Sequence, residues 1–143
     1  MHIQLKKLDE RAILPTRGSA LAAGADLYAL DGVTIASGET VLVHTGIALA
    51  IPEGYAGLIY ARSGLAAKRG LAPANKVGVI DADYRGEIMV ALHNHSGLPQ
   101  AVDAGERIAQ LVVTPFLSVE FDECDALDET ARGTGGFGST GTR

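Results

Sequence analysis

The sequence contains no tryptophan, only 5% aromatic residues and a single cysteine, Cys124. Because an internal disulfide needs two cysteines, the chain forms none, which favours a reducing compartment. With so few aromatic rings, the aliphatic residues Val, Ile, Leu and Ala must do most of the core packing. A length of 143 residues suits one domain with a single core.

Positive charge is also scarce, with 12 Lys and Arg residues against 17 Asp and Glu, for a formal net charge of −5. Such a chain has no general attraction to nucleic acid or to an acidic membrane, so we expect neither partner. Residues 1–10 lack the apolar run of a signal peptide, and glycine and proline interrupt the most apolar stretch, 41–61. No segment reaches the roughly 20 apolar residues that span a bilayer. We expect a soluble, cytoplasmic protein.

Glycine, in contrast, is abundant: the chain has 18, more than the usual share of about 7%. Turn pairs such as Asp31-Gly32 and Ser37-Gly38 separate short runs that favour β-structure. The expected strands cover residues 3–5, 33–35, 40–51, 56–60, 77–80, 87–93, 106–114 and 119–121. This pattern predicts an all-β sandwich or jelly-roll-like barrel.

One short helix is expected over residues 63–69, with Ser63 placed to cap it and Gly70 to end it. The last part of the sequence differs in composition, because residues 120–129 carry six acids and residues 132–143 include five glycines. We therefore expect a β domain over residues 1–127 and a mobile tail over residues 128–143.

Two internal segments hold candidate site residues. Arg62-Ser63-Gly64 lies at a strand-to-helix junction that suits phosphate, although an ordinary helix start with a surface arginine gives the same pattern. The segment 78–86 predicts a hairpin whose Asp81 either activates water or is a solvated turn acid.

Asp26 and Gln110 are the remaining internal candidates. Asp26 lies in a stretch of small residues, where an aspartate often bonds its own backbone. Gln110 is a lone polar residue in an apolar run and needs a partner if buried, for which a ligand is one option.

Residues 133–138 match the dinucleotide pattern GxGxxG, which requires a strand before it and a helix after it. Only five residues follow in this sequence, so we expect no such helix and reject this interpretation. Arg132, Phe137, Ser139 and Thr140 supply a cation, an aromatic ring and two hydroxyls among the glycines. Such a segment is either a featureless tail or a cover for an anionic nucleotide.

These segments occur in an order that resembles the homotrimeric dUTPase family. The five matching motifs are residues 23–29, 61–68, 78–86, 105–111 and 132–141. The resemblance covers the chain from about residue 3 onward and departs from the family at no motif position. It implies a distorted jelly-roll (β-clip) subunit and a homotrimer, with three active sites that each draw motifs from all three chains.

The activity implied by the resemblance is Mg²⁺-assisted hydrolysis of dUTP to dUMP and pyrophosphate by water attack at the α-phosphorus. This reaction limits uracil incorporation into DNA and supplies dUMP for thymidylate synthesis. Asp81 is the implied general base. The ion would be held by phosphate oxygens and water with no direct protein ligand, and Asp26 would join its water network.

The resemblance also implies the residues that bind substrate. The phosphates would be bound by Arg62, Ser63, Gly64 and Gln110, with Arg132 at the γ-phosphate and Gly138, Ser139 and Thr140 closing over the chain. Uracil would be read by Asn75, by backbone groups near Val79 and Ile80, and by Met89. Tyr84 would pack on the deoxyribose, and Phe137 of another subunit would stack on uracil.

Two alternative functions remain open from the sequence. A relative that deaminates dCTP shares the implied fold but activates water at a pyrimidine carbon. A non-catalytic nucleotide-binding protein of the same fold would not need the carboxylate of Asp81.

Overall fold

The computed structural model describes residues 1–136, and its secondary structure is almost entirely β. The helix is α1 (Ser63–Arg69). The strands are β1 (Gln4–Lys7), β2 (Ala25–Tyr28), β3 (Val33–Ile35), β4 (Thr40–Ala50), β5 (Tyr55–Tyr60), β6 (Leu71–Pro73), β7 (Gly78–Ile80), β8 (Glu87–Asn94), β9 (Gln100–Val102) and β10 (Arg107–Pro115). The predicted all-β fold, a distorted jelly roll with one short helix, is confirmed.

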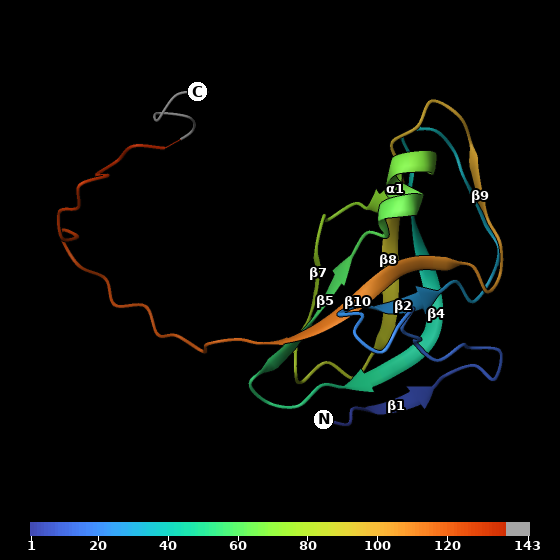
Figure 1. Ribbon diagram of the computed structural model, residues 1–143, viewed down its shortest axis with the longest axis horizontal. Helices are drawn as coiled ribbons and strands as arrows, with labels where there is room; N and C mark the ends of the chain where they lie inside the picture. The colour runs from blue at the N-terminus through green and yellow to red at the C-terminus, as the bar shows by residue number, and fades with distance from the viewer. Residues whose placement is uncertain (137–143) are drawn as a thin grey trace.

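The strands form two four-stranded sheets and one two-stranded sheet, with all pairs antiparallel. Sheet A has the order β1-β4-β8-β6, sheet B the order β2-β10-β5-β7, and sheet C pairs β3 with β9 (Figure 1). Successive side chains of a strand point to opposite faces, so Ile88, Val90 and Leu92 of β8 are buried while Met89 is exposed. The core is aliphatic, as the composition predicts.

The helix prediction is correct in its bounds and wrong in its cap. Gly70 ends the helix in the left-handed conformation, with φ 68°, as glycine does most easily. The N-cap residue is Arg62, whose carbonyl accepts the bond from the Ala66 N–H, and no side chain caps the helix. Ser63 is therefore the first helical residue.

The predicted hairpin over residues 78–86 is also wrong. β7 pairs with β5 in sheet B, whereas β8 pairs with β4 and β6 in sheet A. The segment 81–86 is therefore a crossing between two sheets, and its six residues are long enough to avoid the tight turn that a hairpin needs. We call residues 81–86 the β7–β8 loop.

The strand predicted at 119–121 is absent, because residues 116–136 are mostly exposed and no strand of the described chain lies beside them. Figure 1 shows this segment leaving the sheets after β10. Three short strands, β2, β6 and β9, were not predicted. Within residues 1–136, no helix has the length and apolar character needed to cross a membrane.

Candidate functional site

Two arginines converge on one carboxylate at the start of sheet B. Asp26 of β2 is only 15% exposed, and its Oδ1 accepts a bond of 2.8 Å from Arg62 Nε. Its Oδ2 accepts a 3.3 Å bond from Arg107 Nη1 at the start of β10. Arg62 also donates to the backbone carbonyl of Arg107 at 3.3 Å. Both guanidinium groups are thereby held in place before any ligand arrives.

Gln110 lies beside this pair of arginines because β10 runs between β2 and β5. Its Cα partners are Asp26 on one side and Tyr60 on the other. Its Nε2 donates to the carbonyl of Ala61 at 2.8 Å, so the hydrogen-bond partner expected for Gln110 is a backbone group of the protein. A Cβ at position 24 would lie 2.4 Å from the Gln110 side-chain oxygen, so a larger residue there would force the Gln110 amide to move. We call Asp26, Arg62, Arg107 and Gln110 the phosphate cluster.

Ser63 and Gly64 begin α1 directly after Arg62, so the chain joins them to the phosphate cluster. Both residues are exposed, and a Cβ at Gly64 would meet nothing within 4 Å. The first turn of α1 contains no acid that would oppose an anion there.

The β7–β8 loop carries Asp81 and Tyr84. Asp81 is exposed, and its carbonyl accepts the Tyr84 N–H at 3.2 Å, which closes a turn. The Tyr84 hydroxyl donates to the backbone carbonyl of Glu87 at 2.9 Å. A Cβ at Gly86 would lie 2.4 Å from that hydroxyl, so only glycine leaves room for the tyrosine ring in this position.

Open strand edges flank this loop. β7, which carries Val79 and Ile80, is the outer strand of sheet B, so one side of it has no strand partner in the described chain. On β8, Ala91 accepts from the Ala74 N–H on the β6 side of the strand. Backbone groups two residues apart point the same way, so those of Met89 face the same side, beyond the end of β6.

Asn75 lies in the exposed connection between β6 and β7. Its side-chain nitrogen is 3.5 Å from the point where a Cβ on Gly78 would stand, which places it against the start of β7. Asn75 therefore adjoins the strand that carries Val79 and Ile80. We call Asn75, Val79, Ile80, Asp81, Tyr84 and Met89 the nucleoside group, after the ligand that the resemblance implies for them.

Asp81 of the nucleoside group and Arg62 of the phosphate cluster lie at opposite ends of β5. Ile80 pairs with Gly57, so Asp81 follows opposite Ala56, whereas Arg62 comes six residues after Ala56. At about 3.3 Å per residue, the two are separated by roughly 20 Å along the strand. Figure 1 shows the β7–β8 connection and α1 at opposite ends of the molecule.

One hollow of about 320 Å³ lies between residues of β1, the segment 14–17 and β10, and its lining includes no predicted site residue.

Arg132 is exposed, and its Nε donates to the carbonyl of Gly135 at 2.8 Å. It lies on the segment that leaves the sheets, so the described chain does not bring it to its own phosphate cluster (Figure 1). Phe137, Gly138, Ser139 and Thr140 lie outside the described residues.

Sequence reasoning missed Arg107. The residue stands within the motif 105–111 as a cation at the start of an apolar run, three positions before Gln110. Residues three apart on a strand point to opposite faces, so spacing alone gave no reason to place the two together. The bulge in the β10–β2 pairing between Arg107 and Ala109 changes this alternation.

Comparisons with known proteins agree with one another. The dUTPase family model matches residues 10–141. A deoxyuridine 5'-triphosphate nucleotidohydrolase of Nocardia farcinica is 51% identical over 140 residues, which cover 97% of this chain and 85% of the relative.

Solved structures give the same result. The dUTPase of Staphylococcus bacteriophage 80alpha with dUPNHPP has a TM-score of 0.91 at 29% identity, covering 98% of both chains. A mutant dUTPase from phage phi11 of S. aureus, whose structure concerns the coordination of a structural Mg(II) ion, has a TM-score of 0.80 at 26% identity, covering 88% of this chain and 98% of that one.

Proposed function

The chain belongs to the dUTPase family, and from this premise we propose that it hydrolyses dUTP to dUMP and pyrophosphate by attack of water at the α-phosphorus. The observation that carries the mechanism is the phosphate cluster, in which two arginines are fixed beside the start of α1. This activity limits uracil incorporation into DNA and supplies dUMP for thymidylate synthesis.

Asp81 is the general base of the proposed reaction. The water oxygen forms a bond to the α-phosphorus, the bond from that phosphorus to the pyrophosphate oxygen breaks, and the water proton passes to the Asp81 carboxylate. A carboxylate is a weak base at neutral pH, so Asp81 acts chiefly by holding the water in line with the leaving group. Its exposed position on the β7–β8 loop leaves it accessible to a water molecule.

The phosphate cluster binds and neutralises the triphosphate. Arg62 and Arg107 donate charge-assisted hydrogen bonds, and Ser63, Gly64 and Gln110 add neutral donors. Charge that develops on the leaving pyrophosphate is stabilised by groups already oriented, which supplies the greatest share of the rate enhancement in many such reactions. An incoming phosphate competes with Asp26 for the two guanidinium groups.

The nucleoside group selects the base and the sugar. The open edge of β7 and the outward backbone groups of Met89 present donors and acceptors that suit the polar edge of uracil. Asn75 adds a side-chain amide. In this proposal the space left for the base is too narrow for the methyl group of thymine. Tyr84 packs against the deoxyribose and excludes a ribose 2′-hydroxyl by clash, which discriminates more strongly than a loose apolar pocket.

The separation of roughly 20 Å between Asp81 and Arg62 supports a homotrimer with shared active sites. The base and the phosphate cluster must both reach the α-phosphate region, so we assign them to different subunits around one substrate. The tail, residues 128–143, closes over the site of a neighbouring subunit, with Arg132 on the γ-phosphate, Phe137 on uracil, and Gly138, Ser139 and Thr140 on the phosphate chain. Residues 1–127 form the β domain of each subunit.

Mg²⁺ would be carried by the substrate. No three His, Cys, Asp or Glu side chains gather in metal-binding geometry within residues 1–136, and both Asp26 oxygens already accept from arginines. This donor set suits an ion held by phosphate oxygens and water, with Asp26 in its water network. When bound, Mg²⁺ would neutralise phosphate charge. We place the enzyme in the cytoplasm, with dUTP and its own copies as its partners.

Product analysis tests the proposal against its two rivals. Folded protein with Mg²⁺ is incubated separately with dUTP, dTTP, dCTP and UTP. We expect dUTP to be hydrolysed to dUMP and pyrophosphate, with much slower turnover of the other three nucleotides. Ammonia from dCTP would instead identify a deaminase, and binding without turnover would identify a nucleotide-binding protein.

A further inference from the structure

The pairing of β4 with β8 is interrupted beside the β7–β8 loop. His44 pairs with Met89 and Ala48 with Glu87, so residues 45–47 of β4 face one residue of β8. Gly46 stands in the middle of this bulge with φ 70°. A Cβ there would lie 2.9 Å from the Ala12 Cβ, so the bulge needs glycine for both its conformation and its space.

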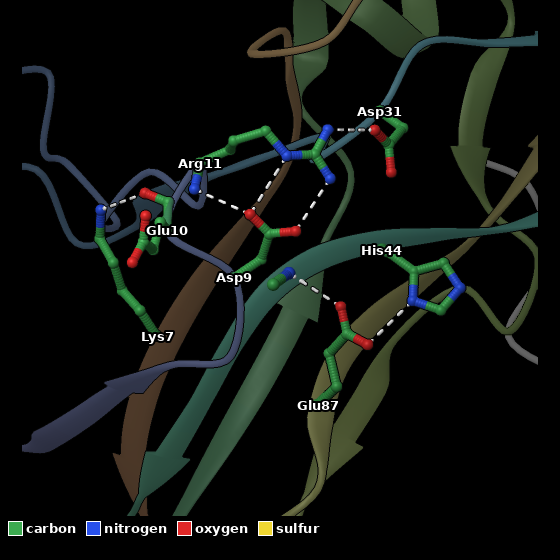
Figure 2. A network of polar contacts seen from close by, with 8 residues as sticks. Lys7, Asp9, Glu10, Arg11, Asp31, His44 and Glu87 are labelled. Carbon is green, nitrogen blue, oxygen red and sulfur yellow. Dashed lines mark hydrogen bonds and ion pairs between the residues drawn. The ribbon is translucent and has the colours of Figure 1, made fainter.

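The carboxylate of Glu87 spans this bulge, as Figure 2 shows. Its Oε1 accepts the Gly46 N–H at 2.8 Å, and its Oε2 lies 2.8 Å from His44 Nδ1. Burial raises the pKa of this carboxyl, but bonds from His44 and from the backbone of Gly46 and Thr45, with the charge of His44, outweigh it and lower the pKa. The surroundings of Glu87 thus stabilise its charged form.

The backbone of the same residue holds Tyr84. The carbonyl of Glu87 points to the side of β8 that Met89 and Ala91 share, and it accepts the Tyr84 hydroxyl. Glu87 therefore bonds the β4 bulge through its carboxylate and holds the Tyr84 hydroxyl through its carbonyl.

We propose that Glu87 is a positioning residue for sugar selection: its carboxylate locks the β4 bulge so that its carbonyl holds the Tyr84 ring where a ribose 2′-hydroxyl would clash. The inference rests on the proposed dUTP hydrolysis and on the place of Tyr84 against the sugar. Glu87 acts through Tyr84 and touches no reacting atom.

The test compares kcat/KM for dUTP and for UTP in four proteins: wild type, Glu87→Ala, Glu87→Gln and Asp9→Ala. Asp9 is the matched control, because its carboxylate belongs to the neighbouring network in Figure 2 and its hydrogen bonds go to Arg11. Glu87→Gln is the conservative rescue, since its amide oxygen still accepts the Gly46 N–H and its amide nitrogen replaces the other carboxylate oxygen beside His44 Nδ1. Circular dichroism and gel filtration establish that each variant is folded and assembled like the wild type.

We expect Glu87→Ala to lower the dUTP-over-UTP ratio by about fivefold, the scale of one lost hydrogen bond. We expect Glu87→Gln and Asp9→Ala to keep the wild-type ratio. An unchanged ratio in Glu87→Ala, or an equal loss in Glu87→Gln, would overturn the inference. If the Glu87 carboxylate contributed to stability alone, Glu87→Ala would lower the unfolding temperature and leave the dUTP-over-UTP ratio unchanged, which would also overturn the inference.

Tyr84→Phe provides a second route if Glu87→Ala does not fold. It removes only the hydroxyl that the Glu87 carbonyl accepts and keeps the ring, so it should reproduce the fall in the ratio, and a wild-type ratio would overturn the inference. The proposed function fails separately: a wild-type protein that hydrolyses neither nucleotide would refute it and the inference together.

Discussion

The phosphate cluster and the nucleoside group are built by different means. In the phosphate cluster, side chains from β2, β10 and the start of α1 hold one another, with a nearly buried carboxylate between two arginines. In the nucleoside group, the proposed recognition surface is backbone, namely the free edge of β7 and the part of β8 beyond the end of β6, together with one tyrosine whose hydroxyl bonds a carbonyl. Charge recognises any triphosphate, whereas a shaped edge distinguishes one base and sugar from another. Affinity and selectivity should therefore be separable by mutation.

The largest effect should come from Asp81, the one residue of the nucleoside group to which the proposed mechanism gives a chemical step. Asp81→Asn keeps the shape of the loop and removes the proton acceptor, so kcat should fall by roughly 10²–10⁴-fold. Binding of a non-hydrolysable dUTP analogue, measured by calorimetry, should stay close to wild type. Asp83→Asn, an exposed acid of the same loop, is the control and should keep full turnover. Normal turnover in Asp81→Asn would remove Asp81 from the mechanism.

Removal of residues 132–143 should have the next largest effect. If the tail supplies Arg132 and Phe137 to both halves of a neighbouring site, kcat/KM for dUTP should fall by at least about tenfold. The unfolding temperature should not change, because no residue of 116–136 belongs to the core. Activity that survives the truncation would deny the tail any closing role.

Arg107→Gln tests whether the phosphate cluster ignores the sugar. Loss of one charge-assisted bond to phosphate should raise KM by about tenfold for dUTP and UTP alike, leaving their ratio unchanged. Lys68→Gln, at the exposed end of α1, is the matched control and should alter neither KM. A change in the ratio would show that the two halves of the site depend on each other.

Local sequence signals predicted the positions of the helix and strands better than they predicted which strands pair. The helix and its left-handed Gly70 follow from residues within one turn of each other, and strand 33–35 was correct at both ends. The pairing of β7 with β5 was missed because the choice between neighbouring sheets depends on contacts distant in sequence. β6 and β9, of three residues each, are too short to show alternation.

The candidate site shows the same limit. The motifs supplied Asp26, Arg62 and Gln110, but their contacts depend on the β2-β10-β5 order, which no single segment encodes. Arg107 was missed because a bulge changes the alternation that spacing assumes. The hydrogen bonds of the Glu87 carboxylate were missed for a related reason, because they span a second bulge, which lies in β4.

The smallest expected effect is a pH dependence of the free energy of unfolding that comes from the Glu87 carboxylate. Because the pKa of Glu87 is lower in the folded chain than its ordinary value of 4.5, its charged form stabilises the fold above that pH. This contribution is lost as the pH falls through the folded-state pKa. The amide introduced by Glu87→Gln does not titrate, so the difference in free energy of unfolding between wild type and this variant should be constant near neutral pH.

Below about pH 4.5 that difference should shrink, with a total change of about 1 kcal/mol or less for one partly exposed pair. Denaturant unfolding from pH 7 to pH 3, at one fixed protein concentration because an oligomer's stability depends on it, measures the change. A difference that stays constant over this range would show that the carboxylate does not gain its bonds on folding. The position of Tyr84 would then depend on the loop backbone, and sugar selection would have to be explained without the Glu87 carboxylate.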